Sequence, residues 1–130
     1  MEVEVFTLCD AAADYQGRLS ILGIFDTIFA PKLPATHPQC SVALRIRFKK
    51  VEAGNHALVL HIVDYDGNLV IPALNGQFGI QLDGQEQYGA VNLILNLHGL
   101  IFKSYGRHAV NLAIDGRETG SLPFTVKQPK

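Results

Sequence analysis

Charged residues are scarce in this sequence: Asp, Glu, Lys and Arg make up 18% of the chain, whereas an average globular domain has roughly 25%. The formal net charge is −1 at pH 7. This balance shows neither the basic footprint of a nucleic-acid partner nor the polybasic patch of a membrane-surface protein, and we expect neither partner. Because little charge is available to cover the surface, we expect another molecule to cover part of its apolar area.

Cysteine is also scarce: the chain has two, Cys9 and Cys40, and neither belongs to a C-x-x-C motif. Each lies within or at the edge of a predicted strand, so we interpret both as buried, reduced thiols that act as small apolar side chains. A disulfide between them is the alternative, but nothing in the sequence favours an oxidising compartment.

We expect neither a targeting segment nor a membrane-spanning segment. The acidic start, Met1 to Glu4, lacks the basic and apolar regions of a secretory signal. No apolar run approaches the ~18 residues that a membrane helix needs. The length of 130 residues fits one domain. We therefore predict a single cytoplasmic domain over residues 1–130.

Local catalytic signatures are absent too. The chain has no Gly-x-Ser-x-Gly, no His-Glu-x-x-His and no phosphate loop, which mark hydrolases, metalloproteases and nucleotide-binding enzymes. We predict a non-enzymatic protein without catalytic residues, cofactor or metal. An enzyme built from dispersed residues is an alternative that no local pattern supports.

The chain does contain a nine-residue pattern that occurs twice. Gly54–Ile62 returns 52 positions later as Gly106–Ile114, with five identical positions. Each copy leads into an Asp-Gly pair, Asp66-Gly67 or Asp115-Gly116, which is typical of a strand entering a hairpin turn. We interpret the two copies as belonging to two related halves of an all-β domain.

Alternation of apolar and polar residues predicts short strands along the whole chain. A loop is predicted at 11–17, and a crossing connection at 30–38, where three prolines occur. Gly23 predicts a bend where one long strand passes between two sheets. These signals predict an antiparallel β-sandwich of immunoglobulin-like or Greek-key type, with about seven to nine strands; a small β-barrel is the alternative. The predicted strands are 3–10, 18–29, 41–49, 56–64, 69–71, 75–82, 90–98, 106–114 and 121–126.

Three segments resemble a known family. They are Val5–Ala12, Gly17–Asp26 and Gly106–Val126, the last with a Gly-x-His strand, Asp-Gly and Leu-Pro-Phe-x-Val. The family consists of short, uncharacterised bacterial proteins and is a domain of unknown function. The resemblance covers nearly the whole chain and implies an all-β, sandwich-like fold in a bacterial, cytoplasmic protein. It implies no activity, ligand or catalytic residue.

Loop aspartates are the candidates for a calcium or small-ligand site. Asp64, Asp66 and Asn68 have the spacing that begins an EF-hand loop, but Leu69 and Asn75 stand where such a loop needs Gly and Glu. We interpret this segment as a turn.

A second acidic group, Asp10, Asp14 and Asp26, comes together only if the first two strands place all three at one end. Asp26 follows a long strand, so we expect it at the far end. We interpret these aspartates as local caps of turn amides.

Histidines and basic residues form two further groups. His56 and His108 hold equivalent positions in the two copies of the pattern. A shared metal site is one interpretation; the other is that each ring packs at a strand start and bonds a turn carbonyl. Arg45, Arg47 and Lys49 form a basic stripe without interleaved aromatic residues, so we interpret it as a solvated strand face and not as a nucleic-acid site.

Several strands are apolar on both faces, although a sandwich sheet normally has one wet face. This predicts that another segment or another subunit covers part of the outer surface. Our leading hypothesis is a module for self-association or for binding a protein partner; the alternative is a small-ligand or calcium-binding sandwich. The candidate interface residues are Leu22, Ile24, Ala57, Val59, His61 and Val63.

Overall fold

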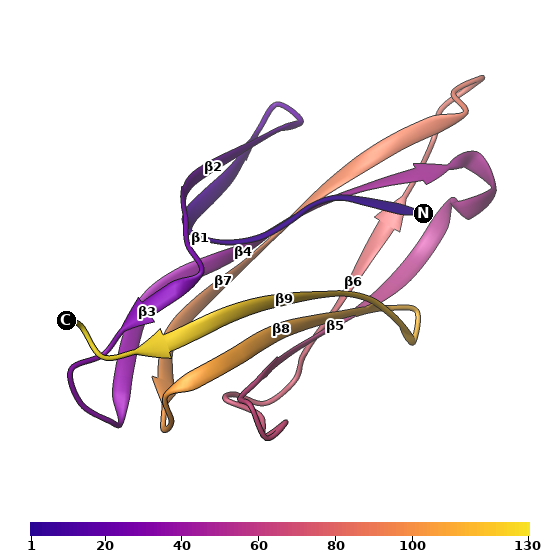
Figure 1. Cartoon of the computed structure of the whole chain (residues 1–130). Helices are drawn as coiled ribbons and strands as arrows, with labels where there is room; N and C mark the ends of the chain where they lie inside the picture. Colours follow the sequence, from indigo (N-terminus) through magenta and orange to yellow (C-terminus); the bar gives the residue numbers. More distant parts are fainter.

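Nine β-strands form two sheets that enclose one hydrophobic core (Figure 1). The computed structural model describes all residues, 1–130, and confirms the predicted β-sandwich. Every neighbouring pair of strands is antiparallel except β3 and β9. Sheet A contains, in spatial order, β2 (Arg18–Ile24), β1 (Glu2–Tyr15), β4 (Ala35–Lys49) and β7 (Tyr88–Phe102). Sheet B contains β3 (Thr27–Phe29), β9 (Arg117–Lys127), β8 (Gly106–Ile114), β5 (Gly54–Val63) and β6 (Leu74–Ile80).

The core lies between the sheets and follows the alternation of the sequence. In β4 every second side chain, Val42, Leu44, Ile46 and Phe48, is buried against the facing sheet, because side chains of a strand point alternately to its two faces. The only helical segment is the 3-10 turn η1 (Lys50–Glu52), and no helix of the structure has the length and apolar character that crossing a bilayer requires.

The two copies of the repeated pattern are β5 and β8, and they pair with each other. Leu60 lies opposite Leu112 in this antiparallel ladder. The prediction of two related halves is therefore wrong, because both copies belong to one sheet. Alternation indicates only that each strand buries one of its faces. Two neighbouring strands of one sheet show this pattern as well as two strands from separate halves of the domain.

The two Asp-Gly pairs have different roles. Asp115-Gly116 forms the tight β8–β9 hairpin turn, with both residues at positive φ (53° and 79°), as a two-residue type I′ turn requires. Asp66-Gly67 lies in a longer loop, residues 64–73, between β5 and β6. The predicted strand at 69–71 is absent: only Leu69 forms a single bridge, to Val63.

The predicted loop at 11–17 is wrong, since β1 continues to Tyr15 and only Gln16-Gly17 turns the chain, again at positive φ. The crossing connection is shorter than predicted, because β4 already begins at Ala35. The predicted passage between sheets is confirmed: β2 belongs to sheet A and β3 to sheet B. Gly23 just before the crossing has a φ of +70°.

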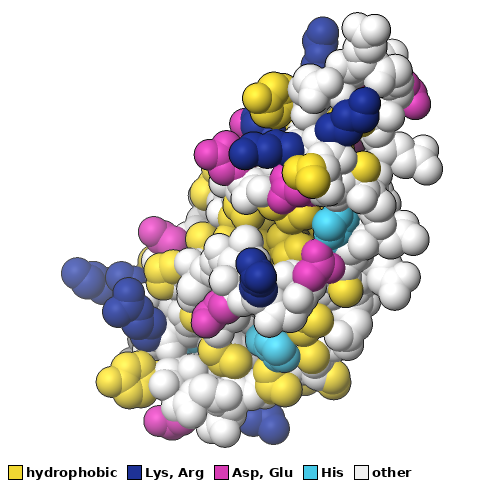
Figure 2. Space-filling model, turned by 90° about the vertical axis from the view of Figure 1, so that its right-hand side faces the viewer, with side chains coloured by type: hydrophobic (Ala, Val, Ile, Leu, Met, Phe, Trp, Pro, Cys, Tyr) yellow, Lys and Arg dark blue, Asp and Glu magenta, His cyan; other side chains and the backbone are white.

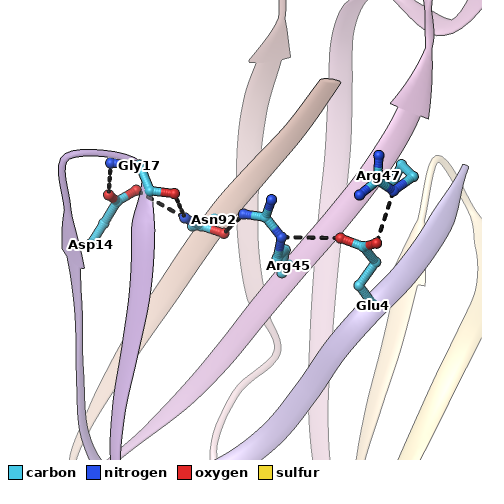
Figure 3. A network of polar contacts seen from close by, with 6 residues as sticks. All are labelled: Glu4, Asp14, Gly17, Arg45, Arg47 and Asn92. Atoms are coloured by element: carbon cyan, nitrogen blue, oxygen red, sulfur yellow. Dashed lines mark hydrogen bonds and ion pairs between the residues drawn. The ribbon is translucent and has the colours of Figure 1, made fainter. Parts of the chain in front are cut away.

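The β1–β2 hairpin covers part of the outer face of sheet A. Ser41 and Ala43 lie on the outer face of β4, yet they are 1% and 0% exposed. The side-chain amide of Asn92, on the outer face of β7, donates to Gly17 O at 3.1 Å and to Asp14 Oδ2 at 3.4 Å (Figure 3). These bonds hold the hairpin tip over the outer face of sheet A, so another segment of the same chain covers part of that face.

Candidate functional site

The β1–β2 hairpin exposes three large hydrophobic side chains. Tyr15, Leu22 and Ile24 are 65%, 71% and 66% exposed. The register of the hairpin puts Leu22 opposite Ala11 and Tyr15 opposite Arg18, so these side chains alternate with the half-buried Ala12, Leu19 and Ile21. We call the exposed side the hairpin face. Its members are Ala11, Ala13, Tyr15, Arg18, Ser20, Leu22 and Ile24.

The other candidate interface residues lie on the outer face of sheet B. Val59, His61 and Val63 are half-buried, and only Ala57 is exposed. Their cross-strand neighbours on β8 are small or polar, with Val59 opposite Ala113. The six predicted interface residues therefore divide between two surfaces, Leu22 and Ile24 on the hairpin face and the other four on this sheet B face.

Two members of the basic stripe on β4, Arg45 and Arg47, share one carboxylate of the same chain. Glu4 accepts a bond from Arg45 Nε at 3.0 Å and one from Arg47 Nε at 2.8 Å (Figure 3). The hydrogen bond from Arg47 lowers the pKa of Glu4, and the bond from Arg45 adds to the effect. Arg45 also donates to Asn92 at 2.9 Å. Arg45 and Arg47 therefore connect β4 with β1 and β7, and the single carboxylate of Glu4 offsets one of their two charges.

Charge is mixed elsewhere on the surface as well. Figure 2 shows one side of the molecule, where Lys and Arg side chains alternate with Asp and Glu and hydrophobic side chains gather between them. Charges of both signs are therefore present on this side.

The loop aspartates stabilise turns. Asp64 Oδ1 accepts from the backbone N–H groups of Asp66 and Asn68 at 3.0 and 2.9 Å, and Asp14 Oδ1 accepts from Gly17 N at 2.9 Å. Asp26 accepts from its neighbour Thr27. No group of three or more His, Cys, Asp or Glu side chains has a geometry that could hold a metal ion. The capping interpretation is therefore confirmed for Asp14, and the turn interpretation is confirmed for the Asp64 segment. Asp26 bonds a hydroxyl and not a turn amide.

The two cysteines are free and fully buried, as predicted. The Cys9 thiol donates a hydrogen bond to the backbone carbonyl oxygen of Ser41, with an S···O distance of 3.5 Å. Burial raises the pKa of the Cys40 thiol to about 11, so this side chain stays protonated near neutral pH and is a poor nucleophile.

The histidines of the repeated pattern lie far apart, because β5 and β8 run in opposite directions. His108 Nδ1 bonds Gly106 O at 3.0 Å, and His56 Nε2 bonds Glu52 O at 2.7 Å. Each ring thus bonds a backbone carbonyl near its strand start, as the second interpretation predicted. The shared metal site is excluded by this separation.

His56 makes a second bond that the sequence did not indicate. Its Nδ1 lies 2.6 Å from Asp115 Oδ2 in the β8–β9 turn, and Asp115 Oδ1 accepts from Ala57 N at 2.9 Å. Asp115 and the Glu52 carbonyl are both acceptors, so only the doubly protonated imidazolium satisfies both. The hydrogen bond to Asp115 raises the pKa of His56, and the same bond lowers the pKa of Asp115.

These directions predict a stability that depends on pH. The contribution of His56 is complete below its ordinary pKa of 6.5 and is lost as the pH rises through the higher pKa of the folded state. The contribution of Asp115 is present above 3.8 and is lost as the pH falls through its lowered value. Urea titrations give the unfolding free energy of the wild type and of His56→Gln at each pH. We expect the difference between the two to be largest between pH 3.8 and pH 6.5.

The same titration can be followed at the residue itself. We expect the NMR signal of the His56 ring to titrate with a midpoint above 6.5. The Asp115→Asn variant is the control, and its His56 midpoint should fall towards the ordinary value. A wild-type midpoint at or below 6.5 would contradict the ion pair.

Comparison with known proteins shows the fold and the family. A structure of Pseudomonas fluorescens alkylpurine DNA glycosylase AlkC, bound to DNA containing an abasic site analog, is similar with a TM-score of 0.51 and 10% sequence identity. The similarity covers 97% of this chain but only 30% of that chain, and at this identity it shows the fold alone. A search of curated protein sequences found no significant match. The model of a family of unknown function, DUF6941, matches residues 4–127, and the chain belongs to this family.

Proposed function

We propose that this domain is a non-enzymatic module that self-associates through the hairpin face and the free edge of β2. The observation that carries the proposal is the exposure of Leu22 (71%) and Ile24 (66%), side by side on one strand with Tyr15 (65%) on the neighbouring strand. Large aliphatic side chains gathered on one surface are costly in water and mark interaction sites.

The backbone of β2 supports this surface. β2 is the edge strand of sheet A, so its outer N–H and C=O groups have no strand partner. Natural edge strands are normally protected by lysine, proline or inward-pointing charge. Between Arg18 and Ile24 the sequence has no proline and no lysine, and Arg18 is its only charged residue. The edge therefore lacks lysine and proline, and its one irregularity is the left-handed Gly23 next to its last residue.

A second copy of the chain fits this edge better than a chemically different partner. Two β2 strands related by a two-fold axis would pair antiparallel and extend sheet A across both molecules. If the axis passes through Ile21, Arg18 of each copy lies beside Ile24 of the other, so the two guanidinium groups stay apart. A face with almost no charge is self-complementary without needing an opposite charge on a partner.

The sheet B face is less favoured as the main interface. Val59, His61 and Val63 are already half-buried by neighbouring side chains, and less apolar area remains to be removed from water. Ser121 and Asn111 on the same face satisfy each other at 2.7 Å.

Light scattering coupled to size-exclusion chromatography tests the proposal. We expect the wild-type chain to be a dimer at micromolar concentration and the Leu22→Lys/Ile24→Lys variant to be a folded monomer. Both side chains are mostly exposed, so the substitutions change little inside the domain. Buried lysines in the interface should weaken the dimer at least about a hundredfold, since each unpaired charge costs several kcal/mol.

A matched control is Val51→Lys in η1. Val51 is 87% exposed but lies outside the hairpin face, so this variant should remain dimeric. A monomeric wild type, or a dimer that survives the double substitution, would contradict the proposal. If Val59→Lys abolished the dimer and the Leu22→Lys/Ile24→Lys variant did not, the interface would lie on the sheet B face.

A further inference from the structure

A small cavity lies at one end of the sandwich, between the 64–73 loop and the connection from β7 to β8. Its volume is about 340 Å³, which is at the lower end of the range of ligand pockets. Side chains from the loop, from the end of β7 and from the start of β8 line it. It is remote from the hairpin face and has no part in the proposed self-association.

His108 provides the first polar group of the cavity. Its ring is 2% exposed and is held between Phe102 and Phe124, each at 5.3 Å between centroids. Because Gly106 O is an acceptor, Nδ1 must donate to it, and Nε2 of the neutral ring is left as an acceptor. The only fully buried side-chain polar atom without a partner is Nε2 of His37. The free Nε2 of His108 therefore reaches the surface, where the ring lines the cavity.

Asp64 provides a second acceptor. Its Oδ1 already accepts from two backbone N–H groups of its own loop, which fixes the carboxylate and leaves Oδ2 without a partner in the chain. Asp64 lines the same cavity as His108. A fixed carboxylate oxygen beside an imidazole acceptor is the environment that an ammonium group requires.

Donors line the cavity as well. Lys103 takes part in none of the ion pairs of the protein, and Ser104 next to it is half-buried and also lines the cavity. An ammonium and a hydroxyl together bind a carboxylate. The rest of the lining consists of Asn68 and of three aliphatic side chains, Leu69, Val70 and Ile101. Leu69 and Ile101 are 51% and 48% exposed.

We propose that this cavity binds a small aliphatic α-amino acid. Its ammonium group would donate to Asp64 Oδ2 and His108 Nε2, its carboxylate would accept from Lys103 and Ser104, and its side chain would cover Leu69, Val70 and Ile101. The three features are complementary to one zwitterion with an apolar side chain, whereas a simple anion would face Asp64 and a simple cation would face Lys103.

Calorimetric titration of the full chain with three probes tests the proposal. We expect saturable binding of L-leucine. 4-Methylpentanoate is leucine without the ammonium group and isoamylamine is leucine without the carboxylate, so each should bind at least about tenfold more weakly. Absence of L-leucine binding at millimolar concentration would overturn the proposal, and so would equal binding of either probe that lacks a charged group.

Lys103→Gln and its matched control Lys32→Gln separate this site from weak binding elsewhere. Both lysines are exposed, so neither change should affect folding, which thermal melting verifies. We expect Lys103→Gln to lower the affinity for L-leucine about tenfold and Lys32→Gln to leave it unchanged. Equal affinity in the two variants would overturn the assignment of the cavity.

Discussion

Phe102→Ala is expected to destabilise the domain by about 3–5 kcal/mol. Phe102 is fully buried at the end of β7. Its ring contacts His108 of β8 edge to face at 5.3 Å and Phe124 of β9 at 5.9 Å between centroids. Because β7 belongs to sheet A and the two partners belong to sheet B, the substitution opens a cavity in the contact between the sheets.

Urea unfolding followed by circular dichroism measures this loss. Phe29→Ala is the control, because Phe29 is 58% exposed and lies on the short strand β3. We expect the control to cost less than about 1.5 kcal/mol, since little of the ring is removed from water in the wild type. A similar cost at both positions would show that the contact between the sheets does not depend on the Phe102 ring.

Gly23→Ala should have the second largest effect, about 2–3 kcal/mol. Gly23 has a φ of +70°, a left-handed conformation that costs an L-residue about 1–2 kcal/mol. An added Cβ would also lie 2.9 Å from Cγ of Asp10 and closer still to Oδ2, so the Asp10 side chain would have to move. The expected result is a lower unfolding free energy, measured in urea.

Two further variants separate the two causes. Gly17 has a φ of +79°, and a Cβ added to it would have no atom within 4 Å. Gly17→Ala should therefore lower the unfolding free energy only by the cost of the left-handed backbone conformation. In the Asp10→Ala background, Gly23→Ala should cost only the φ part of the unfolding free energy, because the contact with the Asp10 side chain is gone. A double-mutant cycle of the two single variants and the double variant measures this difference. If the double variant is no more stable than Gly23→Ala, the contact with Asp10 carries none of the effect.

The fold class could be predicted because alternation is a local signal. In β4 the set Val42, Leu44, Ile46 and Phe48 could be assigned to the core from the sequence, and all four are buried. The bonds of His56 and His108 to backbone carbonyls were predictable for the same reason, since their acceptors Glu52 and Gly106 lie within a few residues.

What the sequence could not indicate are contacts between distant segments. Alternation places Leu22 and Val59 on a face of their own strands, but it does not say to which sheet each strand belongs. The pairing of the two repeat copies, the bond of His56 to Asp115 and the folding of the hairpin onto Asn92 join residues at least 46 positions apart. Such partners are set by the whole topology and leave no local pattern.

The single parallel pair of strands has a consequence for how the chain folds. β3 forms its ladder only with β9, through Thr27 with Thr125 and Phe29 with Lys127. β9 also completes the hairpin with β8, so it lies between an early and a late segment of the chain. Bringing β3 and β9 together closes a loop of most of the chain, and the entropy lost on closing such a loop slows folding. On a ribosome, β3 would therefore remain without its partner until almost the entire domain had been synthesised, and its apolar residues would stay accessible to chaperones during that time.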